Sequence, residues 1–252
     1  MSNQIHPTAQ VSAQAQLGDN NVIGPFVSIE DDVTIGNNNK FLQGVVLHSG
    51  SRIGNDNTIH EYSVIAGLPQ DIAFDGRPTQ VVIGDNNVLR EYVTISRATK
   101  DDAPTRLGNY LYLMNQVHLG HDCVLADRVI IAPGTGLGGH VHVGERAFIS
   151  GGVMVHQFVQ VGTVAMIGGN SKIIKDVLPY MITDGVPAEP HGPNVVGLRR
   201  AGFTSEDLRD LKQAYKIIRR MSLSKEEVLA QLRGLGTETA NHLAEFIENS
   251  RR

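Results

Sequence analysis

Residues 107–173 divide into sixes as LGNYLY-LMNQVH-LGHDCV-LADRVI-IAPGTG-LGGHVH-VGERAF-ISGGVM-VHQFVQ-VGTVAM-IGGNSK-I, and every group begins with Leu, Ile or Val. The same phase extends back to Ile5, and an aliphatic residue or Phe occupies 26 of the 29 positions between Ile5 and Ile173. An α-helix, with its period of 3.6 residues, cannot produce this pattern, whereas a solenoid of hexapeptide repeats requires it. The sequence therefore predicts a mainly β fold whose successive coils stack on one another.

The fifth residue of many groups is also small or apolar, as at Val27, Ser51 and Cys123, so two positions in six can face a narrow interior. We therefore interpret the single cysteine as a packing residue. Runs of Gly, Asp and Asn at 18–21, 36–39 and 54–57 are typical of corners, because these residues accept left-handed backbone angles at low cost.

The phase fails at three charged residues, Asp71, Arg77 and Asp101. A charged side chain cannot face a dry interior without a partner, so loops near 67–81 and 98–106 are expected to leave the coil. Loops on a rigid scaffold commonly contain functional residues, although tolerated insertions would also explain them.

After Ile173 the period ends, and a passage containing Pro and Gly follows from 179 to 197. Helices are expected to begin at Thr204, Ser224 and Thr237, because these are N-cap residues that precede apolar stripes. We predict a β-helix over residues 1–185 and a small helical domain over 186–252.

The composition excludes several classes of function. A net charge of −4 with only 5% aromatic residues argues against nucleic acid as the main partner. The sequence begins without a basic and apolar leader, and no apolar run approaches the length of a membrane span. We expect a cytoplasmic protein without membrane insertion, cofactor or bound metal.

Four histidines gather in the last third of the repeats, at 118, 121, 140 and 156. Stacking of positions three hexads apart places Gly139 over His121, Gln157 over Gly139, and His140 over Asp122. A general base beside an unobstructed backbone N–H can remove a proton from an acceptor and stabilise a tetrahedral oxyanion. The stacked corners that contain these histidines and Gly139 form a ridge, and this ridge indicates acyl transfer. A single surface histidine, by contrast, is usually inert.

Several motifs together make a resemblance specific: HPTA at 6–9, Gln70-Asp71, HLGHD at 118–122, GH at 139–140, VHQF at 155–158 and Asn194 before Gly202-Phe203. With them the chain resembles the UDP-N-acetylglucosamine O-acyltransferase family of lipid A biosynthesis, within the hexapeptide-repeat acyltransferase superfamily. The resemblance implies a left-handed parallel β-helix with three hexads per coil and a cytoplasmic homotrimer. It also implies transfer of a (3-hydroxy)acyl chain from acyl carrier protein to the 3-hydroxyl of UDP-N-acetylglucosamine.

The resemblance also implies residue roles. His121 would be the general base, Asp122 the carboxylate that orients it, and Gly139 the oxyanion N–H. Substrate contacts would be made by Gln70, Asp71, His118, His140, His156, Gln157, Asn194 and Arg200, the last two to the nucleotide. Gly169, beside Met166, would limit the length of the acyl chain.

Four positions depart from the family pattern, at Ala73, Ser96, Val196 and Ala201. Three of them replace an expected Lys, His or Arg, and Val196 replaces an acidic residue. The same chemistry on a different nucleotide sugar or an amino sugar therefore stays open as an alternative. More remote alternatives are a trimeric zinc hydratase, because imidazole is a common zinc ligand, and a non-catalytic scaffold.

Two surfaces suggest partners. Apolar residues expected on the outer faces, Val46, Leu113, Met114 and Ile130, favour a trimer with sites between adjacent coils. Basic residues on the first tail helix could attract the acidic acyl carrier protein, although a solvated helix face would look the same. These basic residues are Lys212, Lys216, Arg219 and Arg220.

Overall fold

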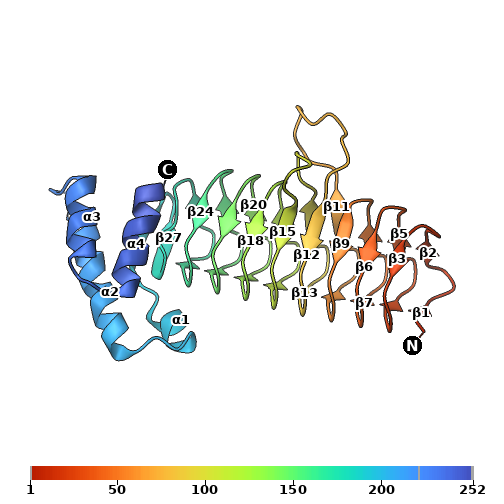
Figure 1. The fold of residues 1–252 in the computed structure, drawn as a ribbon, viewed down its shortest axis with the longest axis horizontal. Coiled ribbons are helices and arrows are strands. Elements are labelled where there is room, and N and C mark those ends of the chain that lie inside the picture. Colours follow the sequence, from red (N-terminus) through yellow and green to blue (C-terminus); the bar gives the residue numbers. More distant parts are fainter. Residues whose placement is uncertain (1, 221, 251–252) are drawn as a thin grey trace.

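The computed structural model describes residues 2–220 and 222–250 and shows a long solenoid with helices at its C-terminal end (Figure 1). The N-terminus lies at the opposite end of the solenoid, and the coils follow one another in sequence order. All strand pairs within the coils are parallel among the described residues, apart from one hairpin at the C-terminal end. The mainly β solenoid predicted from the hexad phase, with a helical region after it, is confirmed.

Each coil contributes one short strand to each of three faces. Face 1 contains β1 (Gln4–Ile5), β4 (Val22–Ile23), β7 (Lys40–Phe41), β10 (Thr58–Ile59), β13 (Val88–Leu89), β16 (Tyr112–Leu113), β19 (Ile130–Ile131), β22 (Phe148–Ile149), β25 (Met166–Ile167), β27 (Met181–Gly185) and β28 (Ala188–Pro193). Face 2 contains β2 (Gln10–Val11), β5 (Ser28–Ile29), β8 (Val46–Leu47), β11 (Val64–Gly67), β14 (Thr94–Ser96), β17 (His118–Leu119), β20 (Gly136–Leu137), β23 (Met154–Val155) and β26 (Lys172–Ile173). Face 3 contains β3 (Gln16–Leu17), β6 (Thr34–Ile35), β9 (Ser51–Ile53), β12 (Val81–Ile83), β15 (Thr105–Leu107), β18 (Val124–Leu125), β21 (His142–Val143) and β24 (Gln160–Val161).

The register between coils is a whole number of hexads as far as β26, apart from one shift at Gly67, whereas Met166 pairs with Ile182 only sixteen residues later. Gln4 pairs with Val22, a step of three hexads. The step is five hexads from Thr58 to Val88 and four from Val88 to Tyr112, because a loop intervenes in each case. Both loops therefore lengthen the chain by whole hexads, so the apolar residues keep facing inward on either side of them.

The core consists of the in-phase residues together with the fifth positions. Cys123 is fully buried there, and burial raises the pKa of its thiol to about 12. Each buried Leu or Ile contributes about 1.5–3 kcal/mol relative to an exposed one. Ile5 is 47% exposed because its strand, β1, lies at the end of face 1 and, among the described strands, pairs only with β4. The assignment of Leu113 to an outer face was wrong, because it is in phase and fully buried.

A ladder of buried asparagines also lies inside the coil. The side chains of Asn21, Asn39, Asn57 and Asn87 are at most 1% exposed. The amide of Asn57 donates to Oδ1 of Asn39 at 3.0 Å and to the Gly84 carbonyl at 3.0 Å, while its own Oδ1 accepts from the backbone N–H of Asn87 at 2.9 Å. The sequence suggested only corners here, whereas the last asparagine of each run points inward.

The corners themselves are left-handed, as the sequence predicted for residues such as Asn20 and Asn38, whose φ angles are near 60°. Bulky residues also take this conformation, including Phe26, Tyr62 and Arg128. A left-handed residue other than Gly costs about 1–2 kcal/mol. Stacking between coils offsets part of that cost, since the Tyr62 and Tyr92 rings stack with centroids 5.5 Å apart.

The chain leaves the coil at residues 68–80 and 97–104, and Asp71, Arg77 and Asp101 lie in these segments. Both segments connect a strand of face 2 to the next strand of face 3. They therefore protrude from the same edge of the solenoid, and Figure 1 shows the projection beside β11 and β12.

The C-terminal part packs on the last coils. The hairpin of β27 and β28 continues face 1 past residue 185, the boundary expected between the β-helix and the helical domain. The helices are α1 (Val195–Arg200), α2 (Ser205–Ile218), α3 (Lys225–Arg233) and α4 (Glu238–Asn249). The N-caps predicted at Thr204, Ser224 and Thr237 are confirmed, but α1 was not foreseen.

A second apolar core joins these helices to the solenoid. It contains Leu198, Leu211, Leu232 and Leu243 together with Tyr180. The Tyr180 hydroxyl also lies 2.5 Å from Nδ1 of His242 on α4. Within residues 2–220 and 222–250, no helix is both long enough and apolar enough to cross a bilayer.

The asparagine ladder yields a stability test. Replacing Asn57 with Ala removes the acceptor for the buried Asn87 N–H and the donor to Gly84, so the free energy of unfolding should fall by about 1–3 kcal/mol. Denaturant unfolding measures the change. Asn241→Ala on the exposed side of α4 is the control and should have little effect. Equal stability of the Asn57 variant and the wild type would contradict a structural role for the ladder.

Candidate active site

The candidate site lies on the edge between faces 2 and 3, where both loops protrude. His121 and Asp122 form the corner between β17 and β18, and Gly139 and His140 form the equivalent corner one coil later. The backbone N–H of His140 donates to the carbonyl of His121 at 2.9 Å, so the two corners are in direct contact. The stacking expected from the three-hexad spacing is therefore present at this edge.

His121 and Asp122 form a hydrogen-bonded pair. Nδ1 of His121 lies 2.7 Å from Oδ2 of Asp122, and the two side chains are only 14% and 12% exposed. An ionised carboxylate can only accept a hydrogen bond, so the imidazole has its proton on Nδ1. The lone pair of Nε2 is then free to act as a base.

The Asp122 carboxylate is held by further donors from the loop at 97–104. The backbone N–H of Thr99 donates to Oδ1 at 3.0 Å, and the Thr99 hydroxyl donates to Oδ2 at 2.7 Å. Burial by itself would raise the pKa of Asp122. The hydrogen bonds from His121 and Thr99 outweigh burial, so the pKa is lowered and the carboxylate is ionised at neutral pH.

Gly139 leaves room for the His121 ring. A Cβ atom at position 139 would overlap this imidazole, with Nε2 only 2.6 Å away, so only glycine fits without displacing the ring. Within the described part of the chain, the Gly139 N–H donates to no protein acceptor. The Gly139 N–H, which has no protein acceptor among the described residues, thus lies beside the imidazole of His121 in the adjacent coil.

His140 and Phe158 complete the ridge. Nε2 of His140 lies 3.5 Å from Oδ2 of Asp122, and its ring meets that of His121 edge-on with centroids 5.1 Å apart. Phe158, one coil further, stacks on His140 at 4.5 Å with an interplanar angle of 6°. Burial lowers the pKa of His140, which favours the neutral ring at physiological pH.

The remaining predicted residues of this edge lie around the cluster. Nδ1 of His118 on β17 is 2.8 Å from the Thr94 hydroxyl, and burial lowers its pKa. His156 and Gln157 are exposed at the corner after β23. Gln70 and Asp71 are exposed on the loop at 68–80, where Asp71 accepts a hydrogen bond from the Ala73 N–H at 2.9 Å. The structure brings together His121, Asp122, Gly139 and His140, with the others at the margin.

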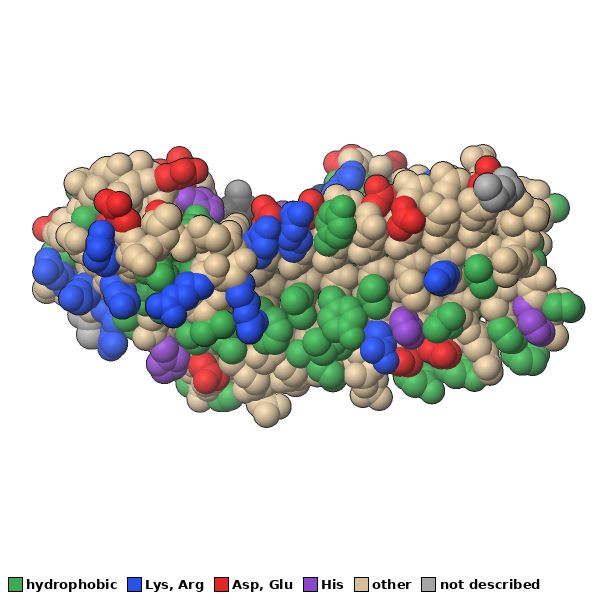
Figure 2. Space-filling view, turned by 90° about the horizontal axis from the view of Figure 1, so that it is seen from below, with side chains coloured by type: hydrophobic (Ala, Val, Ile, Leu, Met, Phe, Trp, Pro, Cys, Tyr) green, Lys and Arg blue, Asp and Glu red, His purple; other side chains and the backbone are tan. Residues whose placement is uncertain are grey.

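A second group of predicted residues lies elsewhere, around a hollow of about 570 Å³ on face 1 beside α1. Asn194, Arg200 and Met166 line it, together with apolar side chains of face 1 such as Ile130 and Phe148. Figure 2 shows hydrophobic side chains gathered on this side of the solenoid, next to the helical end. Asn194 is also the N-cap of α1, where its side chain accepts from the Gly197 N–H at 3.0 Å. Gly169 is exposed just after β25.

Sequence reasoning missed Thr99 and Phe158. Phe158 could have been found, because it follows His140 by three hexads and must stack on it. Nothing in the repeat identifies Thr99, because it lies where the chain has left the coil.

Two groups of side chains have ligand atoms close enough to bind a metal ion among the described residues. The first is His121, Asp122 and His140. Two ligands of one zinc ion are about 3.3 Å apart, given bond lengths of about 2.0–2.1 Å and tetrahedral angles. The 2.7 Å separation of Nδ1 of His121 and Oδ2 of Asp122 is that of a hydrogen bond and is too short for two ligands of one zinc ion.

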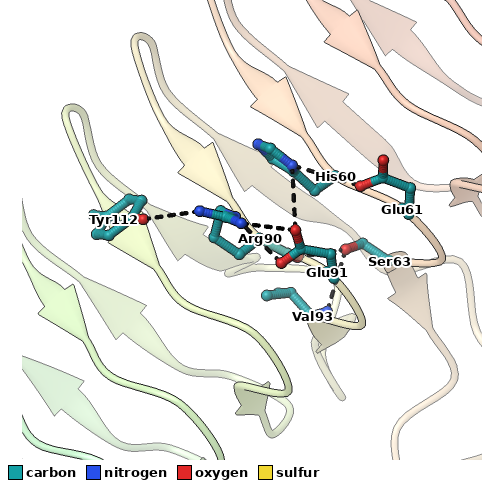
Figure 3. Close-up of polar contacts among 7 residues, drawn as sticks. All are labelled: His60, Glu61, Ser63, Arg90, Glu91, Val93 and Tyr112. Carbon is teal, nitrogen blue, oxygen red and sulfur yellow. Dashed lines mark hydrogen bonds and ion pairs between the residues drawn. The ribbon is translucent and has the colours of Figure 1, made fainter.

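The second group is His60, Glu61 and Glu91, where Nδ1 of His60 lies 3.6 and 3.7 Å from the two carboxylates (Figure 3). The guanidinium of Arg90 donates to both oxygens of Glu91, at 2.8 and 3.2 Å, and also contacts the Tyr112 hydroxyl. This guanidinium already neutralises Glu91 and would repel a cation. The group is therefore an ion-pair network.

Comparisons with known proteins bear on the whole chain. A family model for domain 2 of UDP-N-acetylglucosamine O-acyltransferase matches residues 176–252, and one for the bacterial transferase hexapeptide matches residues 32–67. An acyl-[acyl-carrier-protein]–UDP-N-acetylglucosamine O-acyltransferase of Paraburkholderia phymatum is 45% identical over 99% of this chain and 98% of its own length. One from Burkholderia mallei is 41% identical over 77% of each chain.

Solved structures of UDP-N-acetylglucosamine acyltransferases also match this chain over nearly its whole length. The UDP-N-acetylglucosamine acyltransferase of Bacteroides fragilis matches with a TM-score of 0.96 and 38% identity, over 99% of this chain and 98% of that one. The enzyme of Francisella novicida matches with a TM-score of 0.95 and 36% identity, over 99% and 92%. Because sequence identity and fold agree from one end to the other, the chain belongs to the acyl-[acyl-carrier-protein]–UDP-N-acetylglucosamine O-acyltransferase family.

Proposed function

We propose that the protein transfers a (3-hydroxy)acyl chain from acyl carrier protein to the 3-hydroxyl of UDP-N-acetylglucosamine, the first step of lipid A synthesis. The observation that supports this most directly is the 2.7 Å contact of His121 with Asp122, beside the vacant N–H of Gly139. Full-length relatives are named for this reaction. The carrier-protein donor and the nucleotide sugar are also the basis for proposing a cytoplasmic location.

In the proposed mechanism, Nε2 of His121 removes the proton from the acceptor hydroxyl as its oxygen attacks the thioester carbonyl. Asp122 holds the Nδ1 proton and stabilises the imidazolium that forms. The tetrahedral oxyanion accepts a hydrogen bond from the Gly139 N–H. The carbon–sulfur bond then breaks, His121 returns the proton to the departing thiolate, and the acyl ester is released.

Removal of the base gives the first test of this mechanism. His121→Ala should lower kcat/KM by about 10²–10⁴-fold, because it deletes general-base catalysis. Asp122→Asn should cost less, since that residue orients the base. Acyl transfer to a panel of UDP-sugars measures both effects and identifies the acceptor, for which we expect UDP-N-acetylglucosamine. His191→Ala, at an exposed position on β28, is the control. Near-normal activity of a folded His121 variant would refute the assignment.

We propose a homotrimer as the active form. The ridge at the edge between faces 2 and 3 has the proposed base, whereas the residues that line the hollow on face 1 include apolar and cationic side chains but no histidine or carboxylate. One chain cannot bring the two together, because its own packed core separates them. A neighbouring copy can place its hollow, with Arg200 and Met166, against the ridge of the first.

Light scattering should therefore give three times the mass of one chain. Co-expression supplies a sharper test: His121→Ala and Arg200→Ala should each be impaired alone, yet mixed trimers should regain activity, since some sites combine an intact ridge with an intact hollow. Homotrimers of each variant are the matched controls. A stable monomer, or mixed assemblies no more active than their parents, would exclude this arrangement.

The basic residues of α2 support docking of the carrier protein. Lys212 and Lys216 are exposed on this helix, and Arg219 and Arg220 are exposed just after it. Figure 2 shows Lys and Arg side chains gathered over the helical end of the molecule. Because acyl carrier proteins are strongly acidic, this surface would steer them towards the site, and more strongly at low ionic strength.

We propose that the acyl chain extends from His121 towards Gly169. Eight hexads separate the two positions, which is about 13 Å along the axis at the spacing of β-strands. A Cβ atom at position 169 would make only ordinary contacts, the nearest being 3.6 Å from the Gly151 carbonyl oxygen, so a larger side chain fits there.

A length-selectivity assay tests this path. Gly169→Met should fill the groove and shift the preference towards shorter donors without abolishing turnover, whereas the wild type should prefer longer ones. The measurement is kcat/KM over a series of acyl-carrier donors of increasing chain length. Lys40→Met, at an exposed position on β7 in a distant coil, is the control. An unchanged length profile in the Gly169 variant would place the acyl chain elsewhere.

A further inference from the structure

The loop at 97–104 is tied to the catalytic pair at both of its ends. Thr99, near its start, donates two hydrogen bonds to the carboxylate of Asp122. Thr105, on β15 where the chain re-enters the coil, accepts a hydrogen bond from the Asp122 backbone N–H at 2.8 Å. Asp122 has a φ of 60°, in the left-handed region that non-Gly residues rarely adopt, so its position depends on such contacts.

The carboxylate needs this support because two imidazoles compete for one of its oxygens. Oδ2 of Asp122 lies 2.7 Å from Nδ1 of His121 and 3.5 Å from Nε2 of His140. A rotation about the terminal side-chain torsion, which is soft in Asp, would direct this oxygen towards the other ring. The two Thr99 donors bind different oxygens and so fix the plane of the carboxylate, with Oδ2 facing His121.

The loop is itself anchored to the solenoid. The Arg97 N–H donates to the Gly67 carbonyl at 2.9 Å, and the Thr105 N–H donates to the Gln80 carbonyl at 3.1 Å. The Arg97 guanidinium also donates to the Ser49 carbonyl at 3.0 Å. Thr99 is therefore presented from a fixed segment, next to the column in which Asp122 and His140 stack.

From these contacts we propose that Thr99 is a positioning residue for the acyl transfer, which locks the Asp122 carboxylate onto Nδ1 of His121 and away from His140. This rests on the proposed function of His121 as the base. The departure of the chain from the coil at 97–104 then has a purpose, because it supplies the Thr99 N–H and hydroxyl as donors to the two different oxygens of Asp122.

Thr99→Val removes the hydroxyl donor and keeps the shape of the side chain. We expect kcat to fall by about 10-fold or more, since a hydrogen bond to a charged group is lost, with KM for UDP-N-acetylglucosamine changed by less than about twofold. Thr99→Ser should restore most of kcat. Thr34→Val on β6, in a distant coil, is the matched control. In an Asp122→Asn background, Thr99→Val should add little, because both changes disturb one unit.

A spectroscopic readout judges the proposal independently of turnover. In protein labelled with ¹⁵N-histidine, the His121 shifts should show the Nδ1–H tautomer in the wild type and a mixture of tautomers in Thr99→Val. Unchanged kcat and tautomer in Thr99→Val, impairment by Ser as severe as by Val, or full additivity with Asp122→Asn would each overturn the proposal. A wild type that transfers no acyl group would refute the proposed function, while the tautomer would still decide whether Thr99 positions the pair.

Discussion

Parallel backbone hydrogen bonds tie each residue of the solenoid to the residue one coil away, at a spacing of about 4.8 Å. This contact determines the core, since in-phase residues such as Leu119 and Leu137 must stack in one inward column. It also makes polar groups repeat, because a buried amide is satisfied only if the neighbouring coil offers a matching one. The asparagine ladder from Asn21 to Asn87 follows from that requirement. Removing one of its amides should lower the free energy of unfolding for the same reason.

The same contact builds the candidate site. Residues far apart in sequence become neighbours along an edge, so Asp122, His140 and Phe158 form one column while His121 and Gly139 form the next. Each such corner is left-handed, which turns the side chains outward. A rigid ladder thereby holds the His121 imidazole, the Asp122 carboxylate and the Gly139 N–H in fixed relative positions, which is the preorganisation that the proposed acyl transfer needs.

A site built on the outer edge of a solenoid is open to solvent on one side. The loops at 68–80 and 97–104 rise from this edge, yet the hollow with Asn194, Arg200 and Met166 lies on face 1. The dense core between them does not deform enough to bring them together. A proposal about the function of this chain is therefore also a proposal about its assembly.

The sequence by itself determined the solenoid, the inward residues and the stacking of Gly139 over His121 and of His140 over Asp122. It could do so because a ladder with a constant step of six converts sequence spacing directly into position. It did not determine the contact of Thr99 with Asp122, the short helix α1 or the inward asparagines. The Thr99 contact and the start of α1 at Asn194 depend on contacts with distant segments, and an asparagine next to a corner can face either way. The tertiary structure decided these features, because only the folded coils supply the buried carbonyls and the ionised carboxylate that these groups bind.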